Sequence, residues 1–242
     1  MSKAGLDTSD FAPYFVGQHV IEPRKSSKME SVYQLRFQVY CIECKFLDAD
    51  AFPEGRESDQ FDADSSHFLA ENLRNEVVGY VRLVPPDAES GQFPWESRCD
   101  RLLPGSKLPP ADESAEISRL MVRGDYRRRR GDMLAGLAPG YGDAPIPGER
   151  RSESPQILLT LYRQMYAHSV KTGIRYWYAA MERSLARSLM RMNFAFRQIG
   201  EEADYFGPVA PYMADLRELE TQIGESNPAL LAWLQKPDVI HS

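Results

Sequence analysis

Residues 77–86, VVGYVRLVPP, decide the fold class, because they place one arginine in an apolar run that ends at two prolines. β-branched residues closed by Pro-Pro predict a strand over residues 77–84. Residues 67–71 predict a second strand, with a turn over 72–75. Arg82 shares a strand face with Val78, Tyr80 and Val84. Because a buried guanidinium is costly unless it is paired, this strand predicts an acidic partner elsewhere in the chain.

A second arginine lies on an apolar stripe of a predicted helix. Ser27 and Glu30 have the spacing of a capping box, and the helix is expected to run to about Glu43. Arg36 lies four residues before Tyr40, on the stripe that faces the core.

The following loop supplies acidic partners for both arginines. Glu57, Asp59 and Asp62 form an E-x-D-x-x-D pattern between residues 47 and 66, and Glu116 and Arg119 add an acid and a base in E-I-S-R. One interpretation is a structural ion-pair network that pins the loop over the sheet. The other is a polar pocket in which one acid becomes a general base, and the two are compatible.

Strict alternation puts Glu116 and Arg119 on opposite faces of their strand. A bulge between Ile117 and Leu120 would bring them into one pocket.

The rest of the chain predicts a single α/β layer. Residues 1–25 are expected to be loosely structured, 26–225 to form the main domain, and 226–242 to form a short helix and a tail. The predicted elements are a strand at 116–123, a helix from 127 to 137, helices at 155–171, 183–192 and 210–223, strands at 174–181 and 194–199, and a last helix capped by Asn227. Residues 138–153 are rich in Pro and Gly and predict a flexible insertion.

Composition narrows the class of protein. The 242 residues carry a net charge of -6, which argues against a nucleic-acid binder. Three cysteines form no disulfide framework, and Cys41 and Cys44 are interpreted as packing residues of the helix, so no metal site is expected. With neither a signal peptide nor an apolar run of spanning length, we expect a soluble cytoplasmic protein.

An arginine run follows the predicted strand at 116–123. Arg127, Arg128, Arg129 and Arg130 precede Gly131, where a turn into a helix leaves backbone N–H groups available for phosphate. The alternative interpretation is that these arginines form a solvent-exposed surface and bind no phosphate. The spacing is similar to the Q/R-x-x-G-x-G/A loop of GNAT acyltransferases, although Met133 occupies the last small position.

Taken together, the chain resembles the bacterial PEP-CTERM/exosortase system-associated acyltransferases, which are GNAT-fold relatives of autoinducer (acyl-homoserine-lactone) synthases and N-acyl amino acid synthases. The similar stretches are LRFQVYCIECKFLD (35–48), GRESDQFDADSSHFL (55–69), VVGYVRLVPP (77–86), AEISRLMV (115–122), YRRRR (126–130) and residues 173–200. Nine residues match the autoinducer-synthase pattern in order: Arg36, Tyr40, Phe46, Glu57, Asp59, Asp62, Arg82, Glu116 and Arg119.

The resemblance implies a GNAT fold, a mixed central sheet flanked by helices, in which two parallel strands splay apart and admit the pantetheine arm of a thioester. The strands are those after Ala115 and at 174–181. Glu116 would then be the general base, with Arg119 beside it, and a backbone N–H near Leu120, Met121 or Val122 would polarise the thioester carbonyl. The acyl chain would lie along Leu158, Leu159, Leu161, Tyr162, Met165, Tyr166, Trp177 and Met181, although such residues are more often plain core.

The same resemblance implies an N-acyltransferase that moves a long-chain acyl group to a small amine. The donor would be acyl carrier protein, docked on the arginine run, or coenzyme A, and no cofactor would be tightly bound. Nothing in the sequence identifies S-adenosylmethionine as a substrate. Acylation of an amino acid or a similar amine is therefore expected rather than production of an acyl-homoserine lactone. The alternative is a non-catalytic protein of the same system that binds an acyl carrier or acyl lipid.

Overall fold

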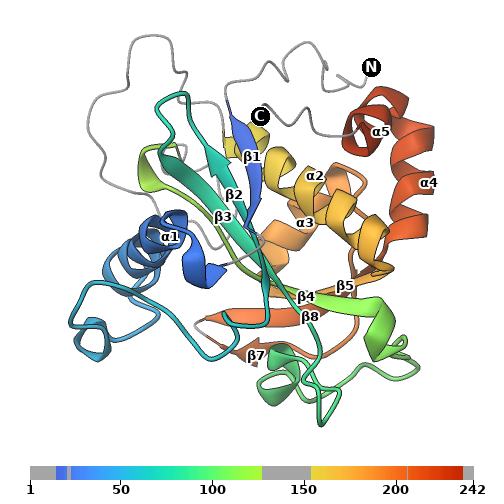
Figure 1. The fold of residues 1–242 in the computed structure, drawn as a ribbon. Coiled ribbons are helices and arrows are strands. Elements are labelled where there is room, and N and C mark those ends of the chain that lie inside the picture. Colours follow the sequence, from blue (N-terminus) through green and yellow to red (C-terminus); the bar gives the residue numbers. More distant parts are fainter. Residues whose placement is uncertain (1–14, 21–22, 127–153, 206, 237–242) are drawn as a thin grey trace.

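The computed structural model describes residues 15–20, 23–126, 154–205 and 207–236 (Figure 1). Its centre is a twisted sheet in the order β1-β2-β3-β4-β5-β8-β6, with β7 paired to β8. The strands are β1 (Val16–Val20), β2 (Ser66–Glu71), β3 (Val77–Val84), β4 (Ser114–Val122), β5 (Tyr176–Met181), β6 (Arg197–Gln198), β7 (Ala203–Asp204) and β8 (Pro208–Asp215). Neighbours pair antiparallel except β4 and β5, which are parallel.

Helices cover both faces of the sheet (Figure 1). They are α1 (Lys28–Phe37), α2 (Ser154–Thr172), α3 (Arg183–Arg191), α4 (Leu216–Ser226) and α5 (Pro228–Gln235), and α1 continues into a π-helical turn, η3 (Gln38–Glu43). On β2, Phe68 packs in the cluster beneath α2, whereas Leu69 packs in the cluster beneath α1. The alternation along this strand therefore supplies a core to each face.

A bulge in β4 changes the direction of its side chains. Tyr80 pairs with Met121 and Arg82 pairs with Ser118, so Arg119 and Leu120 together face the single residue between them on β3. Arg119 has a φ of 55°, in the left-handed region that non-glycine residues rarely adopt. The bulge between Ile117 and Leu120, which Glu116 and Arg119 need in order to share a pocket, is present.

The parallel strands β4 and β5 separate after a short pairing. Their register extends only from Ser114 opposite Tyr176 to Glu116 opposite Tyr178, and a cavity lies between the residues that follow on each strand. This confirms the expected splay, and the mixed sheet flanked by helices is the fold class expected from the sequence.

The predicted elements were wrong in several places. Residues 208–215 form β8, and α4 begins only at Leu216, where the Asp215 side chain accepts a hydrogen bond from the Arg217 N–H. A short apolar run cannot be assigned to helix or strand from periodicity alone, and here pairing with β5 decides it. Residues 16–20, in the segment expected to be loose, form the edge strand β1. At the start of α1, Ser27 makes no side-chain cap; instead the Ser26 hydroxyl accepts from the Lys28 N–H.

Candidate active site

Arg36 anchors the acidic loop to α1. Its Nε and Nη2 donate to the two carboxylate oxygens of Glu57 at 2.5 and 2.9 Å, and its Nη1 donates to Asp62 at 2.5 Å. Both Arg36 and Glu57 are essentially fully buried. A fork of this kind satisfies a buried guanidinium through paired, charge-assisted hydrogen bonds.

Arg82 holds the same loop from β3. Its Nη1 donates to Asp59 at 2.6 Å and to Asp62 at 2.5 Å, and its Nη2 donates to the other Asp59 oxygen at 2.7 Å. The loop is shaped to receive these bonds, because the Asp59 N–H donates to the Asp62 side chain at 2.8 Å. Burial acts to raise the pKa of Asp59, but the hydrogen bonds and charge of Arg82 outweigh it and lower that pKa to about 2.

Arg119 joins the network because the bulge directs it toward the loop. Its Nη2 donates to Glu57 at 3.1 Å and to Asp59 at 3.0 Å, and its guanidinium lies 5.0 Å from the centre of the Tyr40 ring. Three arginines from three elements thus meet three carboxylates from one loop. The network is balanced in charge, which suits a rigid wall.

His67 completes the support of this wall, and the sequence reasoning missed it. The buried ring contacts the Asp62 carbonyl through Nε2 at 2.8 Å and the Tyr80 hydroxyl through Nδ1 at 2.7 Å. A carbonyl can only accept, so Nε2 carries the proton and Nδ1 accepts from Tyr80. Burial lowers the pKa of His67 and so favours the neutral ring.

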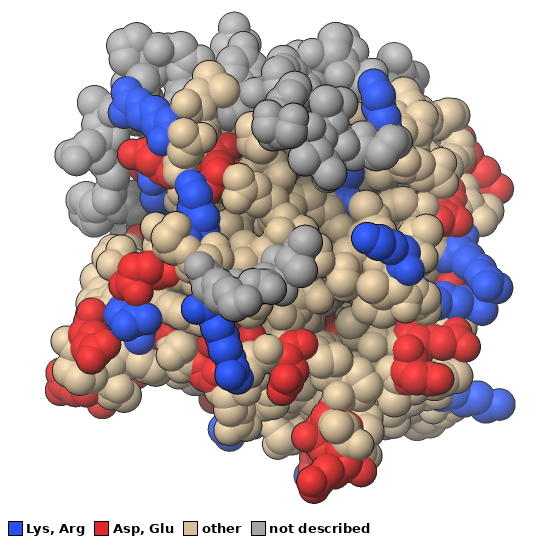
Figure 2. Space-filling view, viewed as in Figure 1, with Lys and Arg blue, Asp and Glu red and all other residues tan. Residues whose placement is uncertain are grey.

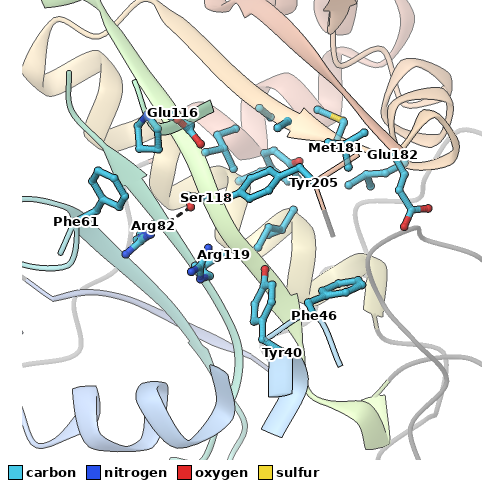
Figure 3. A pocket seen from close by; sticks show the side chains of 18 residues that line it. Tyr40, Phe46, Phe61, Arg82, Glu116, Ser118, Arg119, Met181, Glu182 and Tyr205 are labelled. Atoms are coloured by element: carbon cyan, nitrogen blue, oxygen red, sulfur yellow. Dashed lines mark hydrogen bonds between the residues drawn. The ribbon is translucent and has the colours of Figure 1, made fainter. Parts of the chain in front are cut away.

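The cavity in the splay has a volume of about 160 Å³. Its polar end contains Arg82, Glu116, Ser118 and Arg119 (Figure 3). The rest of the lining is mainly apolar or aromatic: Tyr40, Phe46, Phe61, Pro94, Ile117, Leu120, Tyr162, Ala179, Ala180, Met181, Glu182, Leu185, Tyr205 and Val209. A mainly apolar cleft with a few convergent polar groups is typical of a small-molecule site.

Glu116 differs from Glu57, Asp59 and Asp62, because none of the described arginines bonds to it. It lies at the last position of β4 that pairs with β5, is 5% exposed, and accepts a hydrogen bond from the Trp95 backbone N–H at 2.9 Å. Burial raises the pKa of Glu116 to about 7, and the Trp95 hydrogen bond and the positive charges of Arg82 and Arg119 only partly oppose this. A carboxyl group that is half ionised near neutral pH is suited to accept and release a proton.

The predicted site residues fall into four groups: those that line the cavity, those behind its wall, those buried in the core, and those outside the described part of the chain. Tyr40, Phe46, Leu120 and Met181 line the cavity together with Arg82, Glu116 and Arg119, whereas Arg36, Glu57, Asp59 and Asp62 stand behind its wall.

Met121, Val122 and Trp177 are buried in the core outside the lining, and the Trp177 Nε1–H donates to the Ser169 hydroxyl at 2.9 Å. Of the expected acyl-tunnel wall, only Tyr162 and Met181 reach the cavity. Arg127, Arg128, Arg129, Arg130, Gly131 and the insertion at 138–153 lie outside the described residues.

Other lining residues were missed because distant loops and elements deliver them. Phe61, Glu182 and Tyr205 give no local signal, since each comes to the cavity through tertiary packing (Figure 3). Ser118 could have been found, because alternation places it on the same strand face as Glu116.

Other classes of site find no support in the described part of the chain. Residues 15–20, 23–126, 154–205 and 207–236 hold no cluster of three His, Cys, Asp or Glu side chains that could bind a metal ion. On the face shown in Figure 2, acidic and basic side chains of the described residues are interspersed, without the continuous basic surface typical of nucleic-acid binding. None of the described helices has the length and apolar character to cross a membrane.

Comparison with known proteins agrees with this architecture. Residues 35–136 match the model of the acetyltransferase (GNAT) domain family. TofI, in a ternary complex with an inhibitor and MTA, is 15% identical, with a TM-score of 0.60 over 88% of this chain and 98% of that one. BjaI, a CoA-dependent acyl-homoserine lactone synthase with SAM and isopentyl-CoA, is 19% identical, with a TM-score of 0.59 over 87% and 89%.

FeeM, an N-acyl amino acid synthase from uncultured soil microbes, is 13% identical, with a TM-score of 0.53 over 89% of this chain and 98% of that one. The chain therefore has the GNAT fold, in the form shared with acyl-transferring synthases.

Proposed function

We propose that the protein is an N-acyltransferase that carries a long-chain acyl group from a thioester to a small amine such as an amino acid. The observation that carries the proposal is Glu116, a buried carboxyl with a pKa of about 7 at the point where β4 and β5 separate. It lines the cavity beside two arginines that are already paired with other carboxylates.

In the proposed reaction, the pantetheine arm of the donor enters the gap between β4 and β5, and the neutral amine attacks the thioester carbonyl. The C–N bond forms and the C–S bond breaks. Glu116 accepts the proton that the amine loses, directly or through a water, and that proton passes to the departing sulfur. A backbone N–H of the bulged segment at Leu120 would stabilise the negative oxygen. No covalent enzyme intermediate is required, so no nucleophile is assigned to Cys41, Cys44 or Cys99.

The donor and the biological setting belong to the proposal as well. We favour acyl carrier protein as donor over coenzyme A, with the arginines at 127–130 as its docking site, and an exosortase system as the pathway. These points rest on the resemblance of the sequence. The arrangement of Glu116 and the splay is independent of them, because either donor presents the same thioester arm.

The test is a search for product by mass spectrometry. Purified protein is incubated with palmitoyl carrier protein, or in parallel with palmitoyl-CoA, and with pooled amino acids. We expect an N-acyl amino acid, and we expect Glu116→Gln to reduce its rate by at least about 100-fold, as loss of a general base does. Glu113→Gln, three residues earlier and outside the cavity lining, is the matched control.

Two results would contradict the proposal. Equal rates for wild type and Glu116→Gln would remove this carboxyl from the mechanism. Tight binding of the loaded carrier without any product, across the amino acids tested, would instead indicate a non-catalytic acyl-binding protein.

A further inference from the structure

The short 3₁₀ turn η5 (Pro94–Ser97) holds one oxygen of the carboxyl group proposed as the base. The Trp95 backbone N–H donates to Glu116 Oε2 at 2.9 Å. The other oxygen, Oε1, forms no hydrogen bond with any of the described residues and keeps some contact with solvent. When the carboxyl group is protonated, Oε2 still accepts from Trp95, so Oε1 carries the proton. The turn therefore decides which oxygen of Glu116 exchanges a proton.

Two reciprocal hydrogen bonds between Phe93 and Glu96 close this turn. The Glu96 side chain accepts from the Phe93 N–H at 2.6 Å, and the Glu96 N–H donates to the Phe93 carbonyl at 3.1 Å. Pro94 has no N–H to donate. Of the four residues 93–96, only Trp95 therefore has a backbone N–H left for Glu116.

Packing fixes the apolar side of the turn. Trp95 is buried, and its ring centre lies 5.4 Å from that of Tyr178. Phe93 packs on the same ring at 5.1 Å, centre to centre. Tyr178 is the residue of β5 that pairs opposite Glu116. Packing thus places the turn beside the splay, and the Glu96 side chain sets its local backbone geometry.

Glu96 also places a negative charge near Glu116. Burial is the main cause that raises the pKa of Glu116, and the charge of Glu96 acts in the same direction. The Trp95 N–H and the charges of Arg82 and Arg119 oppose this rise of the pKa. Two other titratable neighbours add no charge near pH 7, because burial raises the pKa of each: the Cys99 thiol and the Tyr178 hydroxyl.

We propose that Glu96 is a positioning residue that closes the turn holding the Trp95 N–H on Glu116, so that one carboxyl oxygen stays fixed and the other exchanges the proton. The inference rests on the proposed acyl transfer, in which Glu116 is the base. Glu96 lies outside the cavity lining, so it acts through Trp95 and Glu116 rather than on the substrate.

The test compares two variants of Glu96 in the pH dependence of acyl transfer. Glu96→Gln keeps an oxygen that can accept from the Phe93 N–H and removes the charge, whereas Glu96→Ala removes both. We expect Glu96→Gln to keep the plateau rate and to move the acid limb of kcat/KM about half a pH unit lower. Glu96→Ala should lower kcat by about 10-fold with little change in KM, because a displaced base slows proton transfer. Glu89→Gln, which changes an exposed acid outside the cavity lining, is the matched control and should leave both measurements unchanged.

NMR gives a second measurement that needs no turnover. The side-chain carboxyl carbon of Glu116, assigned by its absence in Glu116→Gln, should titrate near pH 7 in wild type and at lower pH in Glu96→Gln. The Trp95 amide signal should follow that titration in wild type and not in Glu96→Ala. An unchanged midpoint in Glu96→Gln, or a Trp95 amide that still follows the carboxyl group in Glu96→Ala, would overturn the inference. Absence of product, together with the expected NMR changes, would contradict the proposed function and leave the positioning of Glu116 by Glu96 standing.

Discussion

Arg36→Ala tests whether the buried ion network holds the acidic loop to the sheet. The substitution removes a side chain with no exposed surface and leaves three hydrogen bonds, two to Glu57 and one to Asp62, without their donor. Breaking a buried pair by removing one partner costs about 3–5 kcal/mol. Glu57 keeps its bonds to Arg119 and Asp62 keeps its bond to Arg82, so we expect about 3 kcal/mol, the lower end of that range.

The measurement is urea unfolding followed by circular dichroism, with Arg56→Ala as the control. Arg56 is 41% exposed and pairs with Glu30 at 3.0 Å on the surface. A surface pair contributes about 0–1 kcal/mol, so the control should change stability little. If Arg36→Ala lowered the free energy of unfolding no more than Arg56→Ala, the conclusion that the buried network holds the loop to the sheet would be refuted.

Two further predictions concern the same network. Arg119→Gly and Arg119→Ala both remove the ion pairs to Glu57 and Asp59, so their difference isolates the backbone. Glycine adopts a φ of 55° freely and alanine does not, so we expect the alanine variant to be less stable by about 1 kcal/mol in thermal or urea unfolding, and the reverse order would contradict the bulge. The low folded pKa of Asp59, about 2 against 3.8 when unfolded, gives a contribution of about 2 kcal/mol that is present above pH 4 and lost as pH falls toward 2. Asp59→Asn should remove this acid-dependent part, and an unchanged stability profile between pH 4 and 2 would contradict the assignment.

The charged network could be predicted from the sequence because it violates a simple rule. Arg36 and Arg82 stand on apolar stripes, and such positions require acidic partners, which the E-x-D-x-x-D loop supplies. The structure pairs these residues as the argument requires. The sequence showed only that Glu116 and Arg119 would need a bulge between them to share a pocket. It could not predict the bulge itself, since no local residue type demands it.

The rest of the site depends on tertiary structure. The side chains of Met121, Val122 and Trp177 pack into the core, because the bulge and the positions of α1 and α2 decide which strand residues face the gap. The role expected near Leu120, Met121 or Val122 belongs to a backbone N–H and stays a prediction. Of the eight expected wall residues, Tyr162 on α2 and Met181 on β5 reach the cavity, and only the packing of these elements around the splay selects them. The sequence predicts the start of a helix where β8 lies, because a short apolar run fits either period, and only pairing with β5 decides for a strand.

The pH dependence of acyl transfer tests the central role of Glu116 most directly. Burial holds its folded pKa near 7, so the carboxylate needed as base is lost as pH falls below that value. We expect kcat/KM to rise through a single ionisation near pH 7 in wild type, and this limb to disappear in the residual activity of Glu116→Gln. An acid limb below pH 5 in wild type, or one near pH 7 that persists in the variant, would contradict the account.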